Sequence, residues 1–537
     1  MKRWLRTGRS TMLVVAGWNL FDALLHVVVD MVEPPRIGGN LAVPAAAAVA
    51  YLVASPLLAA FAATLAGGAV LGLNLAWVVN EGGIAAPAFV FIAVTLVLLG
   101  WAVRRFLQEA PDAARDAAQS WHARTWVRAT VAVVAMVGMA AVTFGAALGQ
   151  AFERQVHNDE LVAADYWNDE LVILSAGMGF DNIIGVPDDD LESVRDAGGT
   201  YYAEPACVEP HDPLVSTFSP ATIERGYRGF ADYDDGLPIV VSWPVLTSTV
   251  QPEDFLFTLN TGEQVVPHSA GLVPNWELNE RNVIVVFGDF GNRGRADEPD
   301  AVFPVKLEIV DDGTPLVFLG PDGEQSGVGL TWETDATPYD SGPRLVGAKL
   351  NHVGEEPEGE GGFGLLENTL LPNDEFALYG GGDFRLRVLT SGGFSPDGLT
   401  GVTPDQYEDF FRIHAIGTDG STVLLSEAGV DYEVAGGTLR VIGLSDLGKP
   451  AGDGVYYDDC YAEDADNYID IILEGDEAAA RSITHIEIPA EGDYLPFYNP
   501  GGPGPTPFPD VRYTAPGPPD LEPVTIALDD PMRVSTE

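Results

Sequence analysis

The sequence predicts an α-helical transmembrane bundle of about five spans, followed by a mainly β, sandwich-like extracytoplasmic region. Long apolar runs are confined to the first 150 residues. Acidic side chains are concentrated after them, where short β-branched and aromatic runs alternate with turn residues. The first pattern is typical of membrane-spanning helices and the second of antiparallel β architecture.

The last apolar run, residues 126–148, marks the boundary between the two regions. As a helix its 23 residues would extend roughly 35 Å, which is enough to cross a bilayer. Two of the earlier spans run from Thr11 to about Val29 and from about Ile84 to Val103. Together with the stretch between them, these runs make up a membrane domain over residues 1–152.

That intervening stretch, from Leu41 to about Val79, contains 39 residues and is too long for a single span. We therefore expect two helices joined by a tight turn. Either Pro56 or the Gly67-Gly68 pair is suited to the break, because both residue types interrupt helices.

Positive charge selects the orientation of the bundle. With five spans and a cytoplasmic N-terminus, nine of the ten basic residues in 1–150 lie on the cytoplasmic side, and only Arg36 lies outside. Four spans would place a basic segment on the outside, against the positive-inside rule. The sequence thus predicts a multi-pass protein of the cell membrane whose partner is the lipid bilayer and whose region after residue 150 is extracellular.

The region after residue 150 is extremely acidic. It carries 18 basic and 72 acidic residues, a formal charge of −54. Such a field repels nucleic acid and anionic membrane surfaces, so we expect no nucleic-acid partner. Scarce lysine and cysteine with abundant carboxylates resemble the composition of extreme halophile proteins. We expect the fragment 153–537 to need high salt to fold, because salt screens the repulsion.

Composition and pattern divide this acidic region further. A short stalk that is helical at its start is expected first, followed by an acidic, loop-rich segment. Two β-rich domains come next, separated by the linker-like stretch GEEPEGEGGFG (354–364). A proline-rich extended tail that cannot form central strands follows. The predicted boundaries are 153–235 for the stalk and acidic segment, 236–353 and 365–495 for the β-rich domains, and 496–537 for the tail.

The first span carries a polar face. Asn19, Asp22 and His26, with Asp30 at the end, recur at offsets of three and four residues and so share one side of a helix. Such a face in a membrane relays protons, binds an ion, or joins helices through hydrogen bonds, with Asn74 a partner from a later span.

Two signals in the β-rich region concern ligands. Asp464, Asp466 and Asp470 lie in DDCYAEDADNYID, whose alternating oxygen-bearing residues resemble a calcium loop but lack its glycine and terminal glutamate. In so acidic a chain, solvated surface is the stronger interpretation, and no other cofactor is expected. Trp276 and Trp332, each followed by glutamate, suggest carbohydrate stacking, although core packing is the commoner role of tryptophan.

The two cysteines, Cys207 and Cys460, are both extracellular in this topology. An oxidising compartment favours a disulfide between them, and two buried free thiols are the alternative.

No sequence motif assigns an activity. Nucleophile-elbow, zinc-protease and phosphate-loop patterns are all missing from the sequence. We expect a structural or binding role at the cell surface, with a surface polymer or protein as partner. One alternative is an exported hydrolase acting on surface polymers, which would require a cleft with two carboxylates and an aromatic platform. The other is a sensor or carrier that uses the polar face of the first span.

Overall fold

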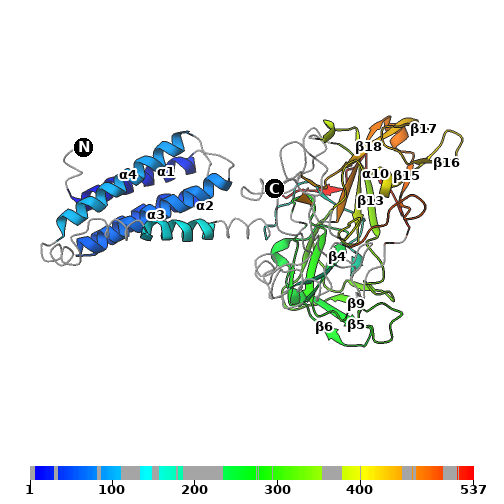
Figure 1. The fold of residues 1–537 in the computed structure, drawn as a ribbon, viewed down its shortest axis with the longest axis horizontal. Helices are drawn as coiled ribbons and strands as arrows, with labels where there is room; N and C mark the ends of the chain where they lie inside the picture. The colour runs from blue at the N-terminus through cyan, green and yellow to red at the C-terminus, as the bar shows by residue number, and fades with distance from the viewer. Residues whose placement is uncertain are drawn as a thin grey trace. The chain divides into compact units, whose positions relative to one another are not determined.

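The computed structural model describes most of the chain. The described residues are 7–28, 34–80, 86–110, 134–147, 157–176, 180–184, 234–273, 275, 277–292, 294–353, 378–398, 401–449, 462–463, 467–499, 517 and 519–536. They belong to two compact units that meet in sequence between Arg154 and Gln155. The N-terminal unit is helical and the C-terminal unit is mainly β (Figure 1).

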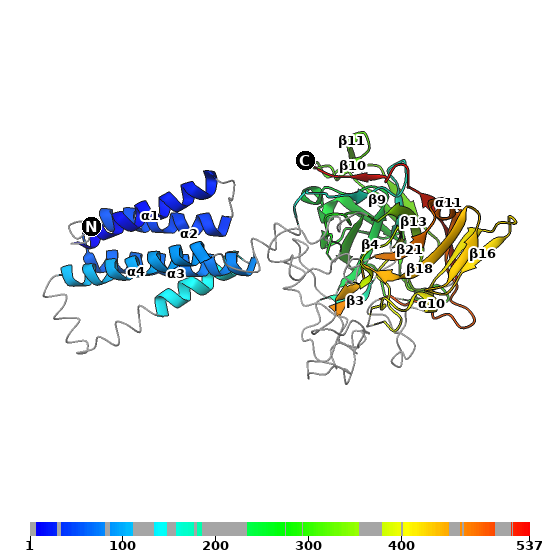
Figure 2. The ribbon, with the colours of Figure 1, turned by 90° about the horizontal axis from the view of Figure 1, so that it is seen from above.

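Four labelled helices build the N-terminal unit, with a further helix over residues 134–147. Each of the four contacts the next, and α1 also contacts α4, which closes the bundle (Figure 2). The bounds are Gly8–Val28 for α1, Pro34–Leu52 for α2, Pro56–Asn80 for α3 and Ala86–Glu109 for α4.

The break in the long apolar stretch falls at Pro56, one of the two predicted positions. Pro56 is the first residue of α3, where its missing N–H would have had no partner in the helix. Gly67 and Gly68 lie within α3 and do not interrupt it. Packing explains their tolerance, because Gly68 lies directly against the helix over 134–147.

Apolar side chains cover much of the outside of this unit. Leu24, Leu52 and Val97 are 62%, 86% and 71% exposed. Within the described residues, two helical segments are long and apolar enough to cross a membrane, Pro56–Ala76 and Phe91–Glu109. The predicted helical N-terminal region with apolar spans is therefore confirmed in this coarser form.

The C-terminal unit contains two pairs of facing sheets. In the first pair, an antiparallel sheet of order β2-β4-β8-β7, with β3 also on β4, shares a hydrophobic core with a four-stranded sheet of order β12-β9-β5-β6. The bounds are β2 Ile173–Ala176, β3 Phe180–Ile184, β4 Asp234–Val241, β5 Phe255–Leu259, β6 Gln264–Val265, β7 Ser269–Gly271, β8 Val283–Gly288, β9 Pro304–Ile309 and β12 Thr331–Glu333.

The second pair has a six-stranded sheet of order β17-β18-β21-β14-β13-β24 and a four-stranded sheet of order β16-β15-β22-β23. These two sheets enclose the larger hydrophobic core. The bounds are β13 Leu345–His352, β14 Phe384–Thr390, β15 Arg412–Ile416, β16 Thr422–Leu425, β17 Asp431–Val434, β18 Gly437–Ser445, β21 Tyr468–Gly475, β22 Ile483–Ile488, β23 Asp520–Pro523 and β24 Thr525–Ile526.

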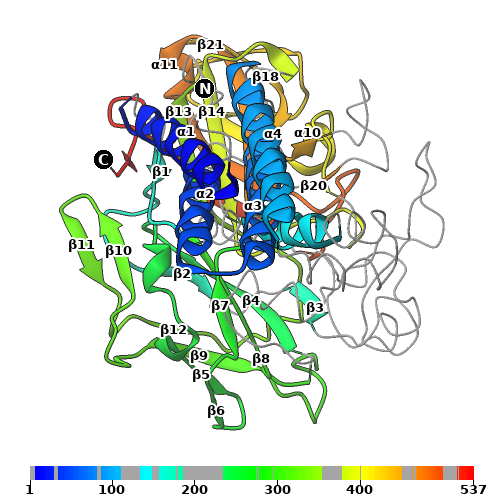
Figure 3. The ribbon, with the colours of Figure 1, turned by 90° about the vertical axis from the view of Figure 1, so that its left-hand side faces the viewer.

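Short elements complete the unit. The β10–β11 hairpin projects from it (Figure 3), and β25, near the C-terminus, pairs with β1. The bounds are β1 Ala164–Asp165, β10 Val317–Gly320, β11 Gly323–Ser326, β19 Gly448–Lys449, β20 Ala462–Glu463, β25 Arg533–Val534, α10 Tyr407–Phe410, α11 Glu477–Ala480, η1 Thr247–Thr249 and η2 Pro252–Asp254.

The segment expected to be a stalk differs from the prediction in its described part. Residues 157–176 contain β1 and β2 and no helix. Tyr166 and Ile173 are buried in the first core. The apolar residues of this segment pack on the β4 sheet, and this tertiary packing overrides its local helical pattern.

The six-stranded sheet is covered on both faces. Along β14, Phe384, Leu386 and Val388 enter the second core, as the two-residue period of a strand requires. The alternate residues Arg385 and Arg387 are buried as well. A small apolar cluster, to which β4 and β8 contribute valines and β14 contributes Leu389, joins this face to the first sheet pair. A row of charged side chains is thereby enclosed between two hydrophobic cores.

Candidate functional site

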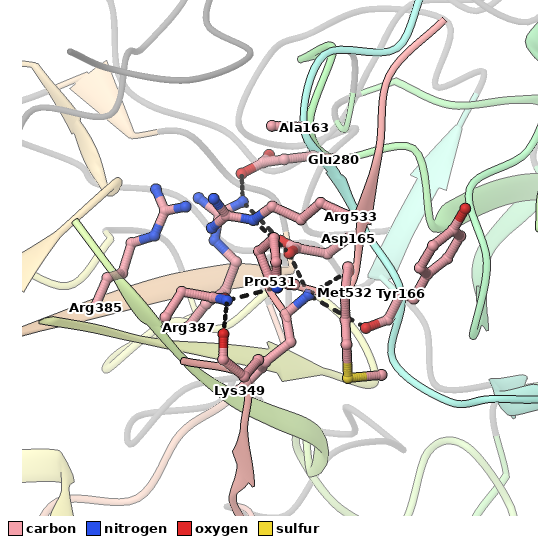
Figure 4. A network of polar contacts seen from close by, with 12 residues as sticks. Ala163, Asp165, Tyr166, Glu280, Lys349, Arg385, Arg387, Pro531, Met532 and Arg533 are labelled. Atoms are coloured by element: carbon pink, nitrogen blue, oxygen red, sulfur yellow. Dashed lines mark hydrogen bonds and ion pairs between the residues drawn. The ribbon is translucent and has the colours of Figure 1, made fainter. Parts of the chain in front are cut away.

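Eight charged side chains lie buried on the covered face of the six-stranded sheet and beside it. Figure 4 labels Asp165, Glu280, Lys349, Arg385, Arg387 and Arg533 among them. Four are acidic and four are basic, and the most exposed of them, Arg533, has a side chain that is only 9% accessible. We call this set the buried charge network. Its members are Asp165, Glu280, Asp446, Asp470, Lys349, Arg385, Arg387 and Arg533.

Lys349, on β13, uses all three of its ammonium donors. It pairs with Asp165 and donates to the carbonyl oxygens of Tyr166 at 3.2 Å and Met532 at 2.9 Å. An ammonium has three N–H groups, so its hydrogen-bonding capacity is filled. Burial lowers the pKa of Lys349 to about 8, and the attraction of Asp165 opposes that shift.

Arg387, on β14, occupies the centre of the network. Its Nε and Nη2 donate to the two oxygens of Asp470 at 2.8 and 2.9 Å, a bidentate arrangement. Nη2 also donates to Asp446 at 2.6 Å, while Nη1 lies 3.3 Å from Glu280 and 3.5 Å from Asp165. Burial alone would lower the pKa of Arg387, but these carboxylates raise it well above its ordinary value.

The acidic members divide into two kinds. Burial alone would raise the pKa of Asp165, but Lys349, Arg533 and Arg387 hold it well below its ordinary value. Burial, and then the charge of Glu280, raise the pKa of Asp446 well above its usual range. The positive charge of Arg387 opposes this shift, because it favours the ionised form of Asp446.

Backbone strain is concentrated around the network. Ala163, Asp446 and Met532 have φ angles of 54°, 62° and 53°, a region that residues other than glycine rarely adopt. Asp446 belongs to the network, and the other two flank β1 and β25. Strained residues persist only where the surrounding structure over-determines them, so the network is held in one geometry.

The C-terminal segment is fixed to this site. Asn351 donates from Nδ2 to the carbonyl oxygens of Ala527 and Pro531, both at 3.1 Å. Arg533 donates to Asp165 at 3.1 Å, next to the β1–β25 pairing. The end of the chain thus closes over the charged face of the six-stranded sheet.

A second feature is a polar crevice of about 350 Å³ lined by segments of both sheet pairs. Its lining combines the indole of Trp332 with Arg344 and the carboxyl groups of Asp340, Asp520 and Glu522. Hydroxyl-bearing residues complete the polar part of the lining, namely Ser175, Thr334, Thr337, Ser341 and Ser391.

Strand β23 supplies two of these carboxyl groups. Asp520 and Glu522 are two residues apart and therefore lie on one face, at a spacing of roughly 7 Å along the strand. Asp520 accepts the backbone N–H of Leu345 at 2.8 Å, and Arg344 Nη2 lies 3.6 Å from it. Burial, and then the charge of Asp520, raise the pKa of Glu522 to about 7.

The predicted polar face of the first span joins helices. Asn19 donates to Thr95 of α4 at 3.3 Å, and Asp22 accepts from Asn40 of α2 at 2.8 Å. His26 lies in α1, but its side chain is outside the described part of the structure. Asn74 donates at 2.7 Å to Val70 within its own helix.

Asp470, one of the three calcium candidates, is buried and paired with two arginines, Arg387 and Arg385, an environment that does not favour a bound cation. Asp464 and Asp466 fall outside the described residues, as do Cys207 and Cys460, so the disulfide stays a prediction. Among the residues that the structure describes, no group of three or more His, Cys, Asp or Glu side chains is arranged to hold a metal ion.

Two histidines lie close together on the four-stranded sheet that contains β15 and β22. His414 and His485 face each other across β15 and β22, with ring centroids 6.2 Å apart. Glu487 contacts His414 and also Arg412. Burial alone would raise the pKa of Glu487, but these hydrogen bonds lower it. The cluster is therefore an ion-paired patch on the outer sheet.

An apolar recess of about 430 Å³ lies in the N-terminal unit, between α3, α4 and Met136. Among the described residues that line it, Thr64 alone bears a hydroxyl group, and the others are apolar. Such a recess offers hydrocarbon contact and almost no group to orient a polar ligand.

The sequence indicates part of the buried charge network. Lys349 is one of only three lysines after residue 150, and Arg385 and Arg387 alternate with apolar residues. This alternation predicts a strand, but it places arginines on a solvent face. Nothing in the sequence predicts that Asp165 and Glu280 approach from distant segments.

Comparisons with known proteins identify no family. No family model matches the chain, and no curated protein matches it. Among solved structures, the S-layer protein rSbsC(31-844) aligns with 97% of this chain and 72% of its own, at 9% identity and a TM-score of 0.11. At that TM-score the likeness supports no conclusion about fold or function.

Proposed function

We propose that this chain is a multi-pass membrane protein of a halophile that presents its acidic β unit outside the cell in a structural or binding role. Five spans with a cytoplasmic N-terminus leave the C-terminal unit outside. The apolar outer surface of the helices and the distribution of positive charge support this arrangement.

The observation that carries the proposed role is the self-pairing of the buried charge network. Catalysis needs ionisable groups that converge on a cavity. Here eight buried charged groups bind one another and tie the C-terminal strand to the six-stranded sheet. Their geometry suits a rigid scaffold that displays its outer surface.

The location is tested with reporter fusions to the full chain. A fusion after Glu170 is expected to report outside, and one at Gln119 inside. Protease added to intact cells is expected to cut the C-terminal unit. A cytoplasmic C-terminal unit would refute the surface role.

A hydrolase is the second candidate, and the polar crevice favours it. Asp520 and Glu522 present two carboxyl groups near an aromatic residue, and the raised pKa of Glu522 suits a proton donor at neutral pH. Release of reducing ends from a surface polysaccharide, lost in Glu522→Gln, would favour this candidate. Unchanged polymer would exclude it for the polysaccharide tested.

A further inference from the structure

We propose that the polar crevice between β12 and β23 is a binding site for a neutral saccharide. This inference deepens the proposed surface-binding role and rests on it for its biological setting. The crevice itself is defined by the fold of the C-terminal unit alone.

The aromatic wall of the crevice is Trp332. It lies on β12, opposite Leu307 of β9, and is half-buried against the first hydrophobic core. Strand pairing and core contacts hold the indole in place, and its remaining surface lines the crevice. A fixed indole offers an apolar face on which the C–H face of a sugar ring packs with little loss of side-chain entropy.

The polar wall can accept and donate hydrogen bonds. Asp520 is held by the Leu345 N–H, so its carboxylate does not need to be ordered when a ligand binds. Asp340 is held in a similar way by the N–H of Ala296 at 3.1 Å. Arg344 is about half exposed and supplies the donors. Ordered acceptors beside a donor and an aromatic face match the alternating hydroxyl groups of a sugar.

Charge narrows the class of ligand. Three carboxyl groups and one guanidinium line the crevice, which disfavours anionic ligands such as phosphates or sulfated glycans. An organic cation would also satisfy the carboxylates. The many hydroxyl groups of the lining favour a neutral, polyhydroxylated ligand over a cation, because a cation needs only acceptors.

The test uses the full chain in lipid nanodiscs in molar KCl, because detergents with sugar headgroups would compete. Calorimetry measures the binding of cellohexaose, mannohexaose and chitohexaose. Trp332→Ala is expected to weaken binding at least about tenfold, or about 1.4 kcal/mol. Trp332→Phe keeps an aromatic face and is expected to retain most of the affinity. Glu333→Gln is the matched control, since this exposed side chain projects from the opposite face of β12.

Three outcomes would overturn the inference: no binding of any of the three sugars, binding that Trp332→Ala leaves unchanged, or displacement of the sugar by tetramethylammonium. The near-ultraviolet circular dichroism of each variant checks that it is folded. Measuring the membrane topology of the same chain distinguishes failure of the saccharide site from failure of the surface role. A surface-exposed unit that binds no sugar refutes the crevice alone, while a sugar-binding unit in the cytoplasm refutes the surface role alone.

Discussion

Arg387 shows why a buried charge can be stable in this protein. Taking a guanidinium out of water is unfavourable unless nearly every donor finds an acceptor. Two carboxylates take the donors of Nε and Nη2, two more lie within 3.5 Å of Nη1, and the ring of Tyr468 lies 5.3 Å from the guanidinium carbon. The planar fork of arginine permits this arrangement, and a lysine ammonium could not reproduce it.

Arg387→Met is expected to destabilise the C-terminal unit by about 3–5 kcal/mol, because Asp470 and Asp446 lose their principal partner inside the protein. Urea unfolding in molar salt measures the loss. Arg387→Lys should recover less than half of it, since lysine cannot make the bidentate contact.

The matched control is Arg440→Met, at an exposed arginine that pairs with Asp431 at 2.6 Å on the surface. It is expected to change stability by less than about 0.5 kcal/mol. Equal losses in the Arg387 and Arg440 variants would mean that the buried charge network does not stabilise the fold.

Glu522 is expected to make stability depend on pH. Its pKa is about 7 in the folded protein against 4.5 ordinarily, so between these values the folded state binds more protons than the unfolded state. The free energy of unfolding therefore falls as pH rises through this window. Glu522→Gln removes this pH dependence. The free energy of unfolding of the variant should exceed that of the unmodified protein by nearly zero below pH 4.5 and by about 1 kcal/mol at pH 8, after allowance for solvent screening.

Urea unfolding of both proteins at acid and alkaline pH measures this difference. Three other charged residues line the crevice: Asp520 on the same strand, Asp340 and Arg344. All three are unchanged in the variant. Glu333→Gln, at an exposed position, is expected to show no such trend. A difference in the free energy of unfolding between the two proteins that does not change with pH would contradict the raised pKa of Glu522.

At the residue scale the sequence predicted little of the candidate site. Arg385 and Arg387 have the pattern of a solvent-facing row, and their burial depends on a second layer that covers the sheet. Asp165 and Lys349 are almost two hundred residues apart, and no local rule joins them. The sequence marks Trp332 through the glutamate that follows it. Asp520 and Glu522, which line the same crevice, lie in the proline-rich tail, where the sequence indicates no site. Sequence patterns report which face a residue occupies, whereas sites between layers depend on tertiary packing.

Two glycines of α3 lie against the backbone of the helix over 134–147. A Cβ atom at Gly68 would lie 2.5 Å from the carbonyl oxygen of Met136. A Cβ atom at Gly72 would overlap Thr143 Oγ1 and the carbonyl oxygen of Ala140. Glycines four residues apart let two helix backbones approach, a common device in membrane proteins.

Gly72→Val is expected to separate these two helices and destabilise the N-terminal unit, because the backbone of the partner helix cannot yield as a side chain could. The thermal midpoint of the full chain in nanodiscs, followed by far-ultraviolet circular dichroism, is expected to fall for this variant. Gly17→Val in α1 is the control, since a Cβ there would meet nothing within 4 Å. A similar fall in both variants would mean that helix propensity, and not packing, causes the change.

At the element scale the sequence predicted more. The length of the apolar runs predicted helices in the N-terminal region, and the break in the long run falls at Pro56, one of the two predicted positions. The alternation of β-branched and aromatic residues gave the β-rich unit with several sheets. The strands within 157–176 were missed, because their pairing partners are distant: β2 pairs with β4, and β1 with β25 near the end of the chain.

Over the whole molecule, the acidic excess and the buried charge network are separate electrostatic systems. The network balances four acidic against four basic side chains, whereas residues 151–537 carry −54 in total. The unbalanced charge must therefore reside outside the network. Salt screens exposed charges over a Debye length of about 3 Å at 1 M, but screens buried pairs much less.

The stability of the fragment 153–537 is accordingly expected to rise from low to molar KCl, because screening relieves the repulsion among its carboxylates. The loss caused by Arg387→Met should be the same at both salt concentrations to within about 0.5 kcal/mol, since its partners are buried. Urea is the suitable denaturant, because guanidinium chloride would itself screen the surface. An unfolding midpoint that does not change with salt would contradict the halophilic interpretation. If the destabilisation caused by Arg387→Met became smaller at high salt, solvent ions would have to reach the buried charge network. The scaffold role, which is argued from the enclosure of that network, would then fail.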